Sequence, residues 1–372
     1  MDNNISTLDQ TVNFAHIGSY ANPWVCVLSY SVRMAQLTHS EIARIAGVSR
    51  STVSRALQNH SAIPEKTRKR LQKLAEKLGY RPNPLVSALM ASRSKPAGPV
   101  GAISIATLTS WPPSSDLAPA PSTQRLLRGA ADRALELGYQ LEEFWIDEPG
   151  MTWERLNQIL INRGIIAVLL APISDNHAEV RLDWDRFSVG TFAPSMQFPR
   201  LHRASHFHFN GACTALEELD RRGYRRPGMI LCAEGVRHVR EQYLGGMAVI
   251  EKRGIFESKI PALVLKNGNR EELKSWMKRH KPDAIVGDEP NTVKWLEELG
   301  YAVPGEVAFA HLDRPPGKEF AGIDQLKELV GRAVIDLIVA QVHRNERGIP
   351  QYAKDTKLAG VWVDGRSVPS RL

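Results

Sequence analysis

Residues 38–57 carry side chains whose types and spacing suit contact with nucleic acid. Five basic or hydroxylic residues fall within six positions: Arg50, Ser51, Thr52, Ser54 and Arg55. Such side chains form hydrogen bonds with phosphates and with base edges in the major groove of DNA. The spacing therefore predicts a polar surface that reads DNA, provided that a rigid element presents it.

A first short helix is expected to begin after Thr38. The Thr38 hydroxyl can accept a free amide of the first turn, and Glu41, three residues on, can reach back. Four apolar residues give this helix a buried side: Ile42, Ala43, Ile45 and Ala46. Gly47 suits the left-handed position that commonly ends a helix.

A second helix is expected after a tight turn, with Ser49 as its N-cap. Val53, Ala56 and Leu57 fall on one face at helical spacing, which leaves the basic and hydroxylic residues on the opposite face. Two short helices joined in this way are predicted to form a helix-turn-helix.

A third helix is predicted from Pro64-Glu65 to Gly79, because Leu71, Leu74 and Leu78 recur at helical spacing. Each helix alone is compatible with any small three-helix module that has a solvated basic face. The joint arrangement of cap, glycine turn, second cap and basic face favours DNA binding.

The positive charge of the chain is concentrated in this module. The 372 residues carry a net charge of +8, and residues 34–96 hold 12 Lys or Arg against 3 Asp or Glu. Residues 1–33 contribute −1, so residues 97–372 sum to zero. A polyanionic partner explains this distribution better than a general effect on solubility.

The N-terminal residues 1–33 show no helical or strand periodicity. They are interpreted either as a disordered arm or as a mis-assigned start, with Met34 as the first residue. Cys26, Cys213 and Cys232 lack the spacing of a disulfide or metal site, which indicates free thiols in a reducing cytoplasm. No segment has transmembrane length, so no membrane partner is expected.

The motif extends through residues 63–68 (IPEKTR), 78–84 (LGYRPNP) and 86–90 (VSALM). This ordered run resembles the lactose/galactose-repressor family of bacterial transcription regulators. The resemblance implies a domain at 34–82, a hinge helix and linker at 83–97, and an effector-binding and dimerisation domain at 98–372. It also implies a homodimer that binds a palindromic DNA operator; a tetramer is disfavoured because no heptad repeat follows Arg366.

The resemblance assigns roles to individual residues of the DNA-binding part. Arg50 and Ser51 are the expected base readers. The residues expected to position the module are Thr52, Ser54, Arg55 and Tyr80, and Thr38 is counted among the DNA contacts. Asn83 is expected to start the hinge, and Leu89 to wedge between base pairs in the minor groove, although Leu89 also suits burial between two hinge helices.

Residues 98–372 show alternating strand-like and helical segments. The predicted strands are 100–106, 165–170, 229–232, 284–286 and 307–310, and the predicted helices are 124–138, 211–223, 271–280, 292–300 and 326–342. This alternation predicts parallel sheets covered by helices. The expected fold is thus an all-α helix-turn-helix domain followed by a two-lobe, periplasmic-binding-protein-like α/β sensor domain.

Five residues are expected at a cleft between the two lobes, where a small-molecule effector such as a sugar would bind. By resemblance, Asp313 and Gln325 could form hydrogen bonds with a ligand hydroxyl, and Asp288 is a third candidate. Trp111 could stack on a flat ligand, although an ordinary surface-loop tryptophan is slightly favoured.

Two departures weaken the assignment of a sugar site. Phe207 stands where the family has a ligand aspartate, and Tyr243 stands where it has an arginine. Arg240 is the expected substitute for that arginine, with a shift of one turn. The effector is therefore less polar than in the family, or absent, which keeps open a ligand-independent architectural DNA binder.

Catalysis is not expected. His202, His206 and His208 lack a further metal ligand in the sequence, so a structural or solvated role is favoured over a metal site. Neither Cys213 nor Cys232 has an evident activating base. No cofactor or metal is predicted, and an enzyme that uses the cleft is the least favoured alternative. Repression is preferred to activation by family analogy.

Overall fold

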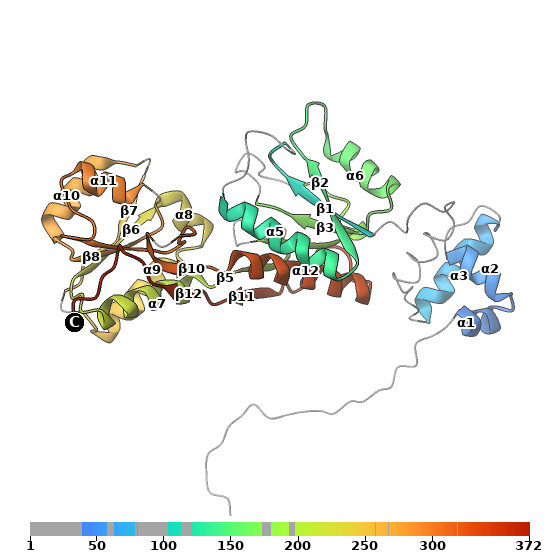
Figure 1. Ribbon diagram of the computed structural model, residues 1–372. Coiled ribbons are helices and arrows are strands. Elements are labelled where there is room, and N and C mark those ends of the chain that lie inside the picture. Colours follow the sequence, from blue (N-terminus) through green and yellow to red (C-terminus); the bar gives the residue numbers. More distant parts are fainter. Residues whose placement is uncertain are drawn as a thin grey trace, which may run out of the picture. The chain divides into compact units, whose positions relative to one another are not determined.

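The computed structural model describes residues 39–57, 63–78, 80, 103–112, 121–172, 180–192, 198–256, 258–266, 268–289, 291–317 and 319–372. The chain divides into two compact units, Met1–Arg81 and Pro82–Leu372. The described part of the first unit is helical, and the second unit contains two α/β lobes (Figure 1). No helix in these ranges is both long enough and apolar enough to cross a membrane.

Helices α1 (His39–Ala46), α2 (Arg50–Leu57) and α3 (Glu65–Lys77) form the described part of the first unit. Their common core consists of Ile42, Ala43, Val53, Ala56, Leu71 and Ala75. Gly47 has a φ of +67°, which confirms the left-handed turn predicted between α1 and α2. A residue with a side chain is strained in this conformation.

The prediction that Ile45 lies on the buried side of α1 was wrong. Ile45 is 50% exposed, whereas Ile42 is fully buried. At 3.6 residues per turn, Ile45 lies about 100° around the helix from the centre of the face formed by Ile42, Ala43 and Ala46. The packed face of α1 is therefore narrower than the run of apolar residues indicates.

The first lobe of the second unit contains a six-stranded sheet in the order β11-β5-β4-β3-β1-β2. Its strands are β1 (Ile103–Thr109), β2 (Tyr139–Trp145), β3 (Ala167–Leu170), β4 (Ser188–Phe192), β5 (His202–His206) and β11 (Asp355–Leu358). All neighbouring strands are parallel. The edge strand β11 joins the sheet from a position about 150 residues after β5 in the sequence.

Helices cover both faces of this first sheet. One face packs against α5 (Pro121–Glu136) and α12 (Lys327–Arg344), and the other packs against α6 (Trp153–Asn162). A short 3-10 helix, Trp184–Arg186, precedes β4. The layered arrangement follows from strands that are buried on both sides.

The second lobe contains a sheet in the order β12-β10-β9-β8-β6-β7. Its strands are β6 (Pro227–Cys232), β7 (Leu263–Leu265), β8 (Ala284–Gly287), β9 (Ala308–His311), β10 (Ala321–Asp324) and β12 (Val361–Val363). Its helices are α7 (His208–Arg221), α8 (Ala233–His238), α9 (Gln242–Arg253), α10 (Arg270–His280) and α11 (Thr292–Glu298). All pairs are parallel except β10 and β12.

The described chain passes between the lobes three times: from β5 to α7, from β10 to α12, and from β11 to β12. These crossings lie close together. A Cβ atom on Gly360 would lie 2.7 Å from the main-chain oxygen of Asp324 and 2.7 Å from Cε1 of His206. The three connections therefore pack against one another at the junction of the two lobes.

Candidate nucleic-acid interface and ligand site

Helix α2 presents the predicted DNA-reading side chains. Arg50, Ser51 and Arg55 are exposed, while Val53 and Ala56 on the opposite side are fully buried. The Ser49 hydroxyl accepts a hydrogen bond of 3.1 Å from the main-chain N–H of Thr52, as predicted for an N-cap. The cap fixes the first turn of α2, and the buried side orients the exposed side chains outward.

Thr52 and Ser54 are half-buried. The Thr52 hydroxyl also forms a hydrogen bond of 2.8 Å with the Ser49 hydroxyl. Thr52 thus stabilises the start of α2, and only part of its hydrogen-bonding capacity is left for a nucleic acid.

Tyr80 connects the two ends of the helical module. Its hydroxyl forms a hydrogen bond of 2.5 Å with Nε2 of His39, the first residue of α1. The two rings lie 5.2 Å apart. Burial, and to a lesser extent the positive charge of Arg50, lowers the pKa of His39. Tyr80 therefore holds α1 against the segment after α3, in addition to any contact with DNA.

Three of the predicted DNA-binding residues, Thr38, Asn83 and Leu89, lie outside the described residues. Cys26 and the proposed start at Met34 also lie outside them.

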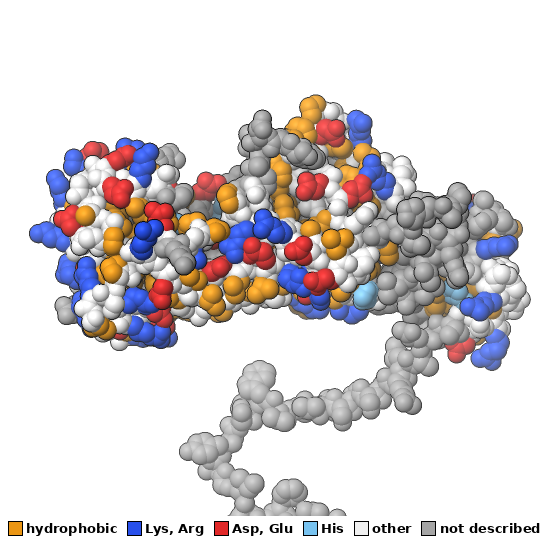
Figure 2. Space-filling model, in the orientation of Figure 1, with side chains coloured by type: hydrophobic (Ala, Val, Ile, Leu, Met, Phe, Trp, Pro, Cys, Tyr) orange, Lys and Arg blue, Asp and Glu red, His pale blue; other side chains and the backbone are white. Residues whose placement is uncertain are grey.

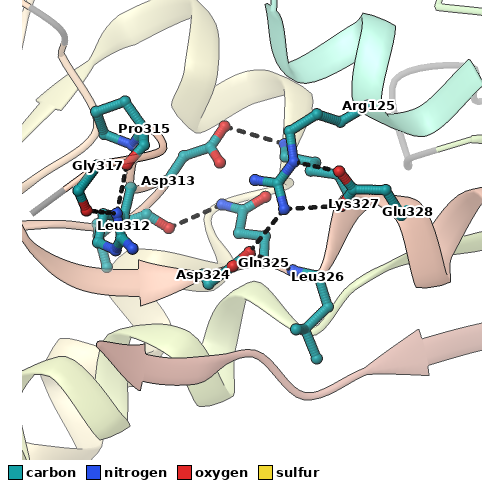
Figure 3. Close-up of polar contacts among 11 residues, drawn as sticks. Arg125, Leu312, Asp313, Pro315, Gly317, Asp324, Gln325, Leu326, Lys327 and Glu328 are labelled. Carbon is teal, nitrogen blue, oxygen red and sulfur yellow. Dashed lines mark hydrogen bonds and ion pairs between the residues drawn. The ribbon is translucent and has the colours of Figure 1, made fainter. Parts of the chain in front are cut away.

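A polar cluster lies where the second lobe meets the start of α12 (Figure 3). The Gln325 side-chain amide donates hydrogen bonds of 3.0 Å to the Tyr243 hydroxyl and 2.8 Å to the main-chain oxygen of Leu312. Asp313 forms an ion pair of 3.0 Å with Lys327. The structure thus places Gln325 and Asp313 in one cluster, and both have partners within the chain.

Tyr243 is central to this cluster because it fills the space next to Gln325. Only 3% of Tyr243 is exposed, and burial raises the pKa of its hydroxyl well above the ordinary value. A neutral phenol replaces the cation that the family resemblance predicts there. The cluster therefore has little capacity for bidentate recognition of a sugar.

Asp288 belongs to the same region of the second lobe. Its carboxylate accepts a hydrogen bond of 2.8 Å from the main-chain N–H of Cys232. Burial raises the pKa of Asp288 to about 6. Asp288 is thus a polar group near Asp313 whose charge depends on pH close to neutrality.

Trp111 and Arg240 occupy other places. Trp111 follows β1, and its main-chain oxygen accepts a hydrogen bond of 2.9 Å from the Thr109 hydroxyl. Arg240 lies between α8 and α9 and lines an open pocket together with Arg200, Arg203 and Lys357. The structure groups Arg240 with these three cations rather than with Asp313 and Gln325.

The sequence did not identify Arg200, Arg203 and Lys357 as site residues. Arg203 and Lys357 lie in β5 and β11, two short polar strands that periodicity did not predict. The segment His202–His206 (HRASH) has no regular alternation that would have identified it as a strand.

His206 and His208 contact each other and neighbouring side chains in the described part of the chain. The rings of His206 and His208 meet edge to face at 5.0 Å, and His208 packs in the same way on Tyr243 at 5.3 Å. Burial lowers the pKa of His206 to about 4 and lowers that of His208 well below its usual value. Within the described ranges, no three His, Cys, Asp or Glu side chains are grouped to hold a metal ion.

Comparison with known proteins identifies the helical module. Residues 38–83 match the family described as bacterial regulatory proteins, lacI family. The chain is 44% identical over 62 residues to the probable HTH-type transcriptional repressor ExuR of Bacillus subtilis, which is 17% of this chain and 19% of that protein. The chain therefore matches about a fifth of the length of this curated relative.

Solved structures resemble the chain over a longer range. The complex of the transcriptional regulator CelR with cellobiose has a TM-score of 0.55 at 19% identity, covering 89% of this chain and 99% of that one. The Lac repressor dimer bound to operator and an anti-inducer has a TM-score of 0.50 at 16% identity, covering 90% and 99%. These likenesses establish the fold: a helix-turn-helix followed by an α/β region with parallel sheets. The helix-turn-helix of this chain is thus similar to that of the lacI family of bacterial regulatory proteins, and the chain as a whole shares the fold of these solved structures.

Proposed function

We propose that the protein is a sequence-specific DNA-binding regulator of transcription, and a repressor rather than an activator. The observation that carries the proposal is the face of α2, where Arg50, Ser51 and Arg55 are exposed on a helix fixed by a cap and a packed back. The relative ExuR is named a probable repressor. We do not expect an enzymatic activity. We expect the protein to bind DNA in the cytoplasm.

A homodimer on a palindromic operator is the proposed binding mode. One α2 helix reaches only a few base pairs, and two copies related by a two-fold axis read two half-sites about one helical turn apart. The Lac repressor, whose fold this chain shares, was solved as a dimer on its operator. Phosphate contacts by Arg55 and its neighbours would supply affinity, and Arg50 and Ser51 would supply specificity.

Control by a small molecule is proposed to act through α12. This helix begins two residues after Gln325 and packs along α5 of the first lobe. Arg125 of α5 forms an ion pair of 3.3 Å with Asp324 and one of 2.7 Å with Glu328 (Figure 3). A ligand that changes the orientation of one lobe relative to the other would therefore move the start of α12 relative to α5. This movement of the first lobe would in turn change the affinity for DNA.

The alternative is an architectural DNA-binding protein whose α/β region serves dimerisation only. One observation favours it: Tyr243, Gln325 and Asp313 have their partners within the chain. Under this alternative the protein binds many sequences with similar affinity, because phosphate contacts carry no sequence information.

Selection of bound duplexes from a random pool by the purified full chain distinguishes the two functions. The proposed regulator enriches a palindrome with two half-sites. Binding of the pool without enrichment of any sequence would contradict sequence-specific regulation and favour the architectural protein.

A further inference from the structure

An open pocket of about 590 Å³ lies between segments of the two lobes. The first lobe contributes residues before and within β5 and within β11, and the second lobe contributes the turn between α8 and α9. The described lining residues do not include Asp288, Asp313 or Gln325. This pocket is therefore separate from the polar cluster around Tyr243.

The pocket carries more positive than negative side chains. Arg200, Arg203, Arg240 and Lys357 line it, against the carboxylates of Glu241 and Asp355. Asp355 forms an ion pair of 3.1 Å with Lys357, which neutralises the one lysine. Three arginines then face a single further carboxylate, so the pocket has an excess of positive charge.

Arg203 is the most informative of these cations. Only 8% of this residue is exposed, and among the described residues its side chain has no hydrogen-bond or ion-pair partner. Burial is the main cause that lowers the pKa of Arg203; the nearby Asp355 carboxylate opposes this shift, and the positive charges of Arg240 and Arg200 add to it. The guanidinium stays charged, and its nitrogens are not among the fully buried atoms that lack a partner, so they reach the pocket. An anion from outside the chain would supply the missing partner.

The backbone holds Arg240 at the pocket. Arg240 and Glu241 have φ values of +52° and +55°, a left-handed conformation that is strained for residues with long side chains. Strained backbone persists where the surrounding structure enforces it, and it is common at ligand sites. The turn places Arg240 in the lining of the pocket, to which the other lobe contributes Arg203.

Two aromatic residues lie at the rim. Phe198 is 76% exposed and Tyr352 is 79% exposed, and both line the pocket. Exposed aromatic rings beside cations are suited to a ligand that has both an apolar or ring-shaped face and a negative charge.

We propose that this pocket binds a small organic anion, with a carboxylate or phosphate group on Arg203 and Arg240 and a ring face against Phe198 and Tyr352. Because the two arginines come from different lobes, a bound anion would draw the lobes together. If the proposed function holds, on which this step rests, the anion is the effector that changes the affinity for DNA.

Thermal unfolding of the full chain tests binding by itself. The probes are glucuronate, glucose 6-phosphate and benzoate, with glucose and benzyl alcohol as neutral counterparts and inorganic phosphate as the simple ion. At least one organic anion is expected to raise Tm by roughly 5 °C at 100 times its Kd, and its neutral counterpart is expected to have no effect. A lack of any shift with all three anions, or equal shifts with the neutral molecules or with inorganic phosphate, would overturn the proposal.

Variants separate a ligand role from a structural one. Arg203→Met keeps much of the side-chain volume and removes a charge that partial burial and repulsion from Arg240 and Arg200 disfavour, so without ligand its Tm is expected to equal or exceed that of the wild type. Its affinity for the anion should fall about 10- to 100-fold. Arg186→Met, at an exposed position outside the pocket, is the matched control and should bind as the wild type does. Unchanged affinity in Arg203→Met, or a lowered Tm without ligand, would contradict the assignment.

Measuring DNA binding with and without the anion distinguishes the failure of one proposal from the failure of the other. Anion binding without a change in affinity for the selected palindrome would leave the pocket as a ligand site and overturn its role as the effector site. A palindrome selected in the absence of any anion binding would leave the proposed regulator intact and reject the pocket.

Discussion

Tyr243 is the residue at which the cluster around Gln325 differs most clearly from the sugar site that the resemblance implies. Its hydroxyl accepts a hydrogen bond from Gln325, and it is almost fully buried. The sequence was sufficient to predict this alteration, because an arginine was expected at this position. It was not sufficient to predict the three cations around Arg240, because Arg203 and Lys357 reach the pocket from strands joined only in three dimensions.

His206 should make stability depend on pH. Its folded pKa of about 4 lies below the ordinary value of 6.5, so the unfolded chain binds more protons between these values. The free energy of unfolding is therefore expected to fall as the pH decreases from about 6.5 to 4, and to be insensitive to this group above 6.5.

His206→Asn should make this loss of stability shallower. The measurement is urea unfolding at pH 7.5 and pH 5 for the wild type, for His206→Asn, and for His343→Asn at an exposed position as the control. An equally steep loss in His206→Asn and in the wild type would show that His206 does not contribute.

Helices α5 and α12 approach each other closely because glycines lie at their contact. A Cβ atom on Gly129 would overlap the main-chain carbonyl of Glu328, and one on Gly331 would overlap that of Leu126. Ion pairs at both ends of this contact join Arg125 to Glu328 and Arg133 to Asp336. The packing therefore couples the start of α12 to the first lobe.

Gly129→Ala is expected to lower the free energy of unfolding by about 1–3 kcal/mol, because the added methyl group must separate the helices. Gly245→Ala is the matched control: it also lies within a helix, and its nearest neighbour would be Cδ2 of Phe209 at an ordinary 3.5 Å. That change should be neutral or stabilising by up to about 1 kcal/mol. Similar effects of the two substitutions would contradict a close helix contact.

Helices and strands could be predicted from the sequence where the signals that specify them are local. The caps, the glycine turn and the apolar spacing of α1, α2 and α3 are contained within about 40 residues, and the structure confirms these helices. The predicted strands and helices of the α/β region are present with shifted ends; β1, for example, runs from Ile103 to Thr109 rather than over 100–106. Strands β2, β4, β5, β7, β10, β11 and β12 were not predicted. Among them, β11 and β12 pair with strands that are distant in the sequence.

The protein consists of a basic helical module and an α/β region in which positive and negative charges are mixed. On the face of the second unit drawn in Figure 2, acidic and basic side chains are interspersed. The net charge of +9 in residues 34–96 is not matched elsewhere in the chain. The affinity for DNA should therefore depend strongly on salt through residues 34–96.

Arg55→Ala should weaken binding to specific and random duplexes alike. It should also reduce the slope of log K against log salt by about one per lost phosphate contact, or about two for a dimer. Fluorescence anisotropy from 50 to 300 mM salt measures the slope, and Lys278→Ala on α10 is a control that removes the same charge from the second unit. An unchanged slope in Arg55→Ala would reject the phosphate contact.

The central claim is that α2 reads DNA sequence within a two-fold dimer, and selection of bound duplexes with the wild type and with Arg50→Ala tests it most directly. We expect the variant to select a palindrome with the same half-site spacing and to lose the preference at one position in each half-site, related by symmetry. An identical consensus for the two proteins, or no palindrome for either, would contradict the claim.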